Sequence, residues 1–147
     1  MGSGYTVPIQ GVTMLKTFKS LLGQRSPEAL PSVPPGERIY AIGDIHGRLD
    51  LMLAMAKAID DDVAHRGAAQ ITIILLGDLV DRGPDSAGVI KAARQWARHR
   101  NLRFITGNHE EMFLDSLAEP EVLKHFLWHG GKETFASYGI DRDMIDN

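Results

Sequence analysis

Three short glycine-containing motifs hold most of the side chains in this sequence that could do chemistry. Residues 43–47 read GDIHG, residues 77–83 read GDLVDRG and residues 107–110 read GNHE. Carboxylate, imidazole and amide oxygen are suitable ligands for divalent manganese, iron or zinc, and the chain has no cysteine that could supply a softer thiolate. The motifs therefore predict a divalent metal site, and its candidate ligands are Asp44, His46, Asp78 and Asn108.

The second and third motifs also contain the groups that phosphate hydrolysis needs besides metal ligands. Two ions about 3.5–4 Å apart can turn a shared water into a nucleophile, so no serine or cysteine nucleophile is required. Asp78 lies on the middle motif and is the candidate for a carboxylate that bridges the ions. Arg82 offers a planar, charged group that matches a phosphate. His109 can protonate the leaving oxygen, and Asp81 could orient His109.

Short strands and longer helices must position these motifs. Apolar runs at residues 38–42, 71–76 and 103–106 predict three strands, and each run ends next to the glycine that opens a motif. Apolar side chains at helical spacing, together with flanking signals, predict helices over the remaining segments, at residues 49–64, 85–100, 110–117 and 120–128. This β-α-β-α-β-α order predicts an α/β fold with a parallel sheet. Functional groups gather at the carboxyl ends of such strands, where the motifs stand.

Composition and charge limit the classes of protein that this chain can represent. It has 147 residues, 44% of them hydrophobic, a net charge of −3 and a pI near 6.0, so there is no basic footprint for nucleic acid. No apolar run approaches the length of about 20 residues that a membrane span needs. Residues 1–36 are expected to form a leader with a short helix and a proline-rich linker, followed by a folded domain over residues 37–147. The absence of cysteine is compatible with a reducing, cytoplasmic location.

Together the motifs GDIHG, GDLVDRG and GNHE resemble the signature of the calcineurin-like metallophosphoesterases. The Asp-Arg-Gly end of the second motif, Glu110 and the segment 128–139 are similar to the phosphoprotein phosphatase branch, including bacterial serine/threonine protein phosphatases. The resemblance implies a layered α-β-β-α sandwich of two facing sheets. Residues 37–147 would be its incomplete N-terminal part, with the parallel β-α-β-α-β core.

The resemblance also implies a role for each motif residue. Two divalent ions are expected, with manganese favoured and iron or zinc as alternatives. The first metal would be bound by Asp44, His46 and Asp78, and the second by Asp78 and Asn108. His109 would be the proton donor with Asp81 as its partner, and Arg82 would bind the phosphate. Glu110 and Glu111 are assigned only to the start of a helix, where carboxylates are favoured.

These roles imply hydrolysis of phosphate monoesters by a metal-bridging hydroxide, with a phosphoprotein as the favoured substrate. The carboxylate at Asp81 is usually missing from the related dinucleoside tetraphosphatases, which favours a serine/threonine protein phosphatase. A hydrolase of dinucleoside polyphosphates or of other small phosphoesters is the first alternative. A truncated, non-catalytic binding remnant is the second.

The match to the family breaks after the third motif. The family places two further metal-binding histidines and a phosphate-binding arginine beyond it, and no histidine follows His129 here. His125 and His129 lie four residues apart on an expected helix, a spacing that can hold a metal but that more often reflects packing or surface. We therefore expect a fragment of a longer enzyme with an exposed sheet flank, possible self-association and little or no phosphatase activity.

Overall fold

Three parallel strands form the sheet on which the motifs stand. The computed structural model describes residues 30–140, and its compact unit begins at Val33. The strands β1 (Glu37–Ile42), β2 (Gln70–Leu75) and β3 (Leu102–Phe104) are arranged in the order β1-β2-β3. Ile42 is paired with Leu75, and Leu75 with Phe104. The last residues of the three strands are therefore level, which brings the motifs that follow them to one edge, and the predicted parallel α/β core is confirmed.

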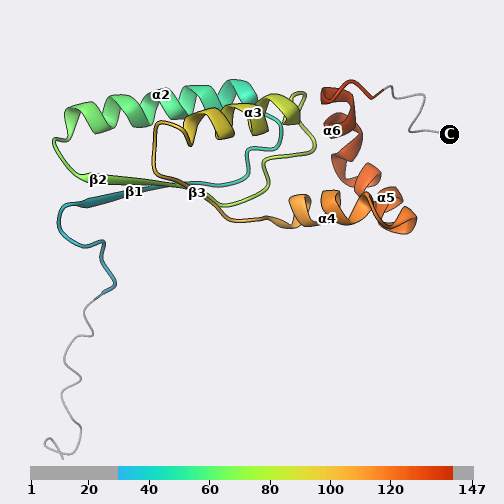
Figure 1. Ribbon diagram of the computed structural model, residues 1–147, viewed down its shortest axis with the longest axis horizontal. Coiled ribbons are helices and arrows are strands. Elements are labelled where there is room, and N and C mark those ends of the chain that lie inside the picture. The colour runs from blue at the N-terminus through green and yellow to red at the C-terminus, as the bar shows by residue number, and fades with distance from the viewer. Residues whose placement is uncertain (1–29, 141–147) are drawn as a thin grey trace, which may run out of the picture. The chain divides into compact units, whose positions relative to one another are not determined.

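Two helices cover one face of this sheet. Helix α2 (Leu49–His65) and helix α3 (Ser86–Trp96) lie side by side above the strands in Figure 1. The core between helices and sheet is formed by buried apolar side chains from both layers: Ile45, Met52, Leu75, Leu79, Val89 and Ala93. Met52 and Ile59 of α2 and Val89 and Ala93 of α3 are buried at helical spacing, so the packing follows part of the apolar pattern in the sequence.

Helix α3 is shorter than the predicted helix over residues 85–100. Asp85 lies just before it as the N-cap residue, where its side chain accepts a hydrogen bond of 2.7 Å from the backbone N–H of Gly88. The helix ends at Trp96, and the N–H groups of Arg98 and His99 bond to carbonyls only three residues back, at 3.1 and 3.0 Å. Such bonds tighten the last turn of a helix and stop its extension.

The segment after the third motif contains one more helix than the sequence predicts. Helix α4 (Asn108–Ser116) and helix α5 (Pro120–Phe126) are followed by a π-helical turn, η1 (Leu127–Gly131), and by α6 (Lys132–Ser137). Gly130 has a φ of 103°, which redirects the chain into α6. Phe113, Phe126 and Phe135 then pack with ring centroids 5.2–6.0 Å apart, so α4, α5 and α6 share a small aromatic core.

The opposite face of the sheet carries exposed apolar side chains. Ile39, Leu76 and Ile105 keep 43%, 48% and 52% of their surface accessible, and no helix within residues 33–140 covers them (Figure 1). Within residues 33–140 this face is therefore an exposed apolar surface, while the expected exposed flank and self-association stay predictions.

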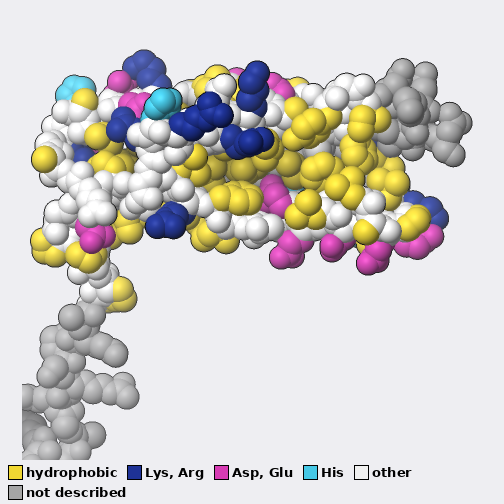
Figure 2. All heavy atoms as spheres, in the orientation of Figure 1, with side chains coloured by type: hydrophobic (Ala, Val, Ile, Leu, Met, Phe, Trp, Pro, Cys, Tyr) yellow, Lys and Arg dark blue, Asp and Glu magenta, His cyan; other side chains and the backbone are white. Residues whose placement is uncertain are grey.

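The surface around the helices is uneven in character. Figure 2 shows further hydrophobic surface over the end formed by α4, α5 and α6, and Lys and Arg side chains gathered over α3. In the part of the chain that the structure describes, no helix is both long and apolar enough to cross a membrane. The N-terminal leader and the short helix expected in it lie outside the described residues.

Candidate functional site

The loop of the second motif, residues 77–83, is the centre of the candidate site. The backbone N–H groups of Asp78 and Leu79 each donate a hydrogen bond of 2.7 Å to the carboxylate of Glu110, and that of Val80 donates one of 3.3 Å. The N–H of Asp81 donates to Thr134 Oγ1 at 2.8 Å and to Ser86 Oγ at 3.1 Å. The next two N–H groups are also bonded, that of Arg82 to the Gly130 carbonyl and that of Gly83 to the Asp81 carbonyl.

Glu110 links the second motif to the third. Its carboxylate, only 7% exposed, accepts a fourth hydrogen bond of 3.0 Å from the N–H of Gly107 at the start of α4. From the sequence, Glu110 is predicted only to stabilise the helix start, and this role accounts for the bond to Gly107. The three bonds to the loop form only because β2 pairs with β3 and brings distant parts of the chain together. The spacing of residues in the sequence therefore could not reveal them.

Backbone strain is concentrated in this site. Within the described residues, the non-glycine residues with positive φ are His46, Asp78, Asp81 and Arg82, at 42°, 52°, 71° and 64°. A left-handed conformation at such residues costs on the order of 1–3 kcal/mol each and persists only when the surroundings enforce it. Here the hydrogen bonds to the loop keep these residues in the left-handed conformation. The side chains of the motif are therefore held in one arrangement.

The first motif docks onto the carbonyl groups of the same loop. The N–H groups of Ile45 and His46 donate to the Asp78 carbonyl at 2.9 and 2.8 Å, and the N–H of Gly47 donates to the Leu79 carbonyl at 2.8 Å. A side chain at Gly83 would collide with the backbone of His46 and Gly47, so the close approach of the two motifs requires glycine there.

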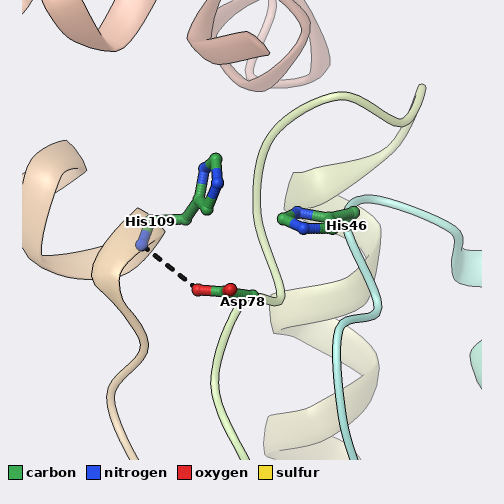
Figure 3. Close-up of side chains that lie close together, drawn as sticks. All are labelled: His46, Asp78 and His109. Carbon is green, nitrogen blue, oxygen red and sulfur yellow. Dashed lines mark hydrogen bonds between the residues drawn. The ribbon is translucent and has the colours of Figure 1, made fainter. Parts of the chain in front are cut away.

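His46 is held with one ring nitrogen turned to the site. Its Nδ1 lies 2.8 Å from the Val80 carbonyl, and since a carbonyl only accepts, Nδ1 carries the proton. Its Nε2 therefore presents a lone pair. Figure 3 shows the His46 ring, the Asp78 carboxylate and the His109 ring facing one another. Potential ligand atoms of these three residues all lie within 4.8 Å of one another.

His109 is oriented in the same way from the other side. Its Nδ1 donates to Asp81 Oδ2 at 2.6 Å, and its backbone N–H donates to Asp78 Oδ1 at 3.2 Å. The Arg82 guanidinium donates to His109 Nε2 and to His46 Nε2, each at 2.8 Å. Because a guanidinium can only donate, both Nε2 atoms offer a lone pair towards the same point.

Asp81 is fully buried beneath His109. Burial raises the pKa of the Asp81 carboxyl above its ordinary value, while hydrogen bonds from Thr134 and His109 act in the opposite direction. The contact that the sequence analysis expected between Asp81 and His109 is thus present. The guanidinium of Arg82 bonds to the two histidines. It makes no hydrogen bond to the nearby acids Asp81 and Asp85 in the structure.

The predicted metal ligands do not all meet. Two of them, His46 and Asp78, lie with His109 in the three-residue group, which does not include Asp44. Asp44 is exposed after β1, and Asn108 is exposed as the first residue of α4. His129 Nδ1 bonds to the His125 carbonyl at 2.8 Å, and no third ligand joins this pair into a group within residues 30–140. The imidazole Nε2 of His46 and the carboxylate of Asp78 do fit a divalent cation.

The chain is similar to known proteins. The model of the calcineurin-like phosphoesterase family matches residues 37–144. Serine/threonine-protein phosphatase 1 of Salmonella typhimurium is 32% identical over 94 residues, which are 63% of this chain and 38% of that protein. The symmetrical bis(5'-nucleosyl)-tetraphosphatase of Yersinia enterocolitica is 41% identical over 71 residues, 48% of this chain and 22% of that protein. A crystal structure of a candidate diadenosine tetraphosphatase aligns with 80% of this chain and 43% of its own, at 25% identity and a TM-score of 0.46.

A parallel α/β core with histidine and aspartate near its strand ends, together with the match to the family model, places the chain in the class of the phosphoesterases. The chain belongs to the calcineurin-like phosphoesterase family, as the match over residues 37–144 shows and as the motifs predicted. Its relatives include a protein phosphatase and a dinucleoside tetraphosphatase, so family membership does not separate these two substrates. The chain spans 38% and 22% of the length of these two relatives.

Replacing Glu110 by glutamine is expected to lower the free energy of unfolding by about 1–3 kcal/mol, because an amide NH2 group then faces backbone N–H groups that need an acceptor. The amide protons of Asp78, Leu79 and Gly107 should exchange faster with solvent, which hydrogen–deuterium exchange followed by NMR measures. Glu111→Gln, on the exposed side of the same helix, is the matched control. Equal exchange rates in the two variants would contradict the role of Glu110.

Proposed function

We propose that the protein, in its full-length form, hydrolyses phosphate esters with the help of divalent metal ions bound at the ends of β1 and β2. The observation that carries this proposal is the convergence of His46, Asp78 and His109 within 4.8 Å, beside the guanidinium of Arg82. Asp44 and Asn108 would complete the ligand set from its exposed rim. Such ions, when bound, activate a water molecule and neutralise charge on the phosphate. We propose manganese as the ion and the cytoplasm as the location.

Arg82 is the proposed phosphate clamp. Its left-handed backbone and the bond from its N–H to the Gly130 carbonyl fix where the side chain begins. Its two terminal nitrogens point at the same two imidazoles that face the metal ligand Asp78. A planar fork with two donors matches two oxygens of a phosphate, so it can bind the substrate and balance its charge.

His109 is the proposed proton donor, with Asp81 as its partner. The Asp81 carboxylate holds Nδ1–H at 2.6 Å, so Nε2 is the nitrogen that faces the substrate side. When Nε2 carries a proton, the buried carboxylate stabilises the cationic ring, and the proton is aimed at the leaving oxygen.

We propose a phosphoserine- or phosphothreonine-containing protein as the substrate and a dinucleoside polyphosphate as the second candidate. The buried Asp81–His109 pair supports the first, because it supplies the proton that an alkyl leaving group requires. The relative that is 41% identical and is named as a tetraphosphatase supports the second.

Replacing His109 by asparagine is expected to lower kcat by about 10²–10⁴-fold, the contribution of a positioned general acid. The affinity for Mn²⁺, measured by isothermal titration calorimetry, should change little, because the ligands are assigned to other residues. Collapse of metal binding in this variant would show instead that His109 is a ligand.

A parallel substrate panel separates the two candidate substrates. In its full-length form, the Mn²⁺-loaded protein is expected to release phosphate from a phosphoserine or phosphothreonine peptide with a higher kcat/KM than from diadenosine tetraphosphate. The reverse order would favour the tetraphosphatase. No hydrolysis of either compound, nor of p-nitrophenyl phosphate, would overturn the proposed activity and favour a non-catalytic binding module.

A further inference from the structure

Helix α6 contributes one buried hydroxyl to the region below His109. Thr134 is fully buried, and its Oγ1 donates a hydrogen bond of 2.7 Å to Asp81 Oδ1. The same oxygen accepts the N–H of Asp81 at 2.8 Å. One side chain from a helix 53 residues further along therefore holds both the backbone and the carboxylate of Asp81.

The directions of these hydrogen bonds follow from what each group can do. A threonine hydroxyl has one proton and two lone pairs. Its proton goes to the Asp81 carboxylate, one lone pair accepts the Asp81 N–H, and Ser86 Oγ lies 3.0 Å away to donate to the other. Ser86 and Thr134 are both fully buried, so no water competes for these positions.

The two oxygens of the Asp81 carboxylate have separate partners in this arrangement. Oδ1 accepts from Thr134, and Oδ2 accepts from Nδ1 of His109 at 2.6 Å. Without the Thr134 hydroxyl, Oδ1 would lose this donor, and the carboxylate could rotate away from the geometry that serves His109. Asp81 also has a φ of 71°, which makes the bond from its N–H part of the restraint on a strained residue.

The segment that carries Thr134 is fixed to the site at two further points. The Gly130 carbonyl accepts the N–H of Arg82 at 3.1 Å, and a Cβ on Gly130 would lie 2.7 Å from that nitrogen. On the other side, Ser137 Oγ accepts the N–H of Ala87 in α3 at 3.0 Å. The position of the Thr134 hydroxyl is thus set by contacts before and after it in the chain.

We propose that Thr134 is a positioning residue, which aims the Asp81 carboxylate at His109 Nδ1 and thereby keeps Nε2 turned to the substrate. The catalytic meaning of this inference rests on the proposed function, in which His109 protonates the leaving oxygen. The geometric part rests only on the hydrogen bonds from Thr134 to Asp81 and from His109 to Asp81.

The test compares Thr134→Val, which has the shape of threonine without its hydroxyl, with Thr134→Ser, which keeps the hydroxyl. Thr72→Val is the matched control, because Thr72 lies in β2 and bonds to Asn101 away from the site. Nitrogen-15 NMR of the histidine ring without added metal reports the tautomer of His109 and the exchange of its Nδ1 proton. Wild type, Thr134→Ser and Thr72→Val should show a single Nδ1–H tautomer with slow exchange, and Thr134→Val should show mixed tautomers and fast exchange.

Turnover provides the second readout. With Mn²⁺, Thr134→Val should lose kcat for an alkyl phosphate by about tenfold or more, the usual scale for an outer hydrogen-bond partner. It should lose much less for p-nitrophenyl phosphate, because nitrophenolate leaves without a proton. Its affinity for Mn²⁺ should not change, since Thr134 touches none of the proposed ligands.

An unchanged His109 tautomer and exchange rate in Thr134→Val would overturn the inference. If Thr134→Val does not fold, the inference is overturned when Thr134→Ser does not keep the tautomer and exchange rate of the wild type. Equal losses of kcat for both esters in Thr134→Val would also overturn it. If instead the wild type hydrolyses no ester while the contrast in tautomers holds, the proposed function fails and the positioning of His109 through Thr134 stands.

Discussion

The backbone of residues 77–83 is the constraint on which the site depends. The N–H groups of residues 78–82 donate hydrogen bonds to residues that come later in the chain. The acceptors are Glu110 in α4, Ser86 in α3, the Gly130 carbonyl just before α6 and Thr134 in α6. The carbonyl groups of the same loop receive the first motif and the His46 ring. One loop therefore sets the relative positions of all three motifs.

This arrangement explains how a strained loop can present chemistry on a rigid base. Left-handed residues are unfavourable when left to themselves, and four of them meet here. Buried acceptors such as Glu110 offset that cost, because breaking away from them would leave N–H groups without partners in the interior. The result is a pair of imidazoles whose Nε2 atoms both lie 2.8 Å from the guanidinium of Arg82, close to the Asp78 carboxylate.

Much of the fold and part of the site could be predicted from sequence. The three strands and the parallel sheet follow from apolar runs in the sequence, whereas the contact between Asp81 and His109, 28 residues apart, was expected because the resemblance to the family gives these two residues partnered roles. Glu110 and Thr134 were missed as site-building residues, because their bonds join segments about 30 and 53 residues apart. Helix α6 was missed because two glycines mark a helix end, whereas Gly130 serves here as a kink. The three-residue group does not include Asp44, so its role as a metal ligand stays a prediction.

The central claim is that His46 and Asp78 hold a divalent cation at the level ends of β1 and β2. Anomalous X-ray scattering from crystals of the protein soaked in Mn²⁺ tests it most directly. We expect a manganese peak within coordination distance of His46 Nε2 and of the Asp78 carboxylate. Well-ordered His46 and Asp78 side chains with no peak between them, or a peak bound only elsewhere on the molecule, would contradict the account.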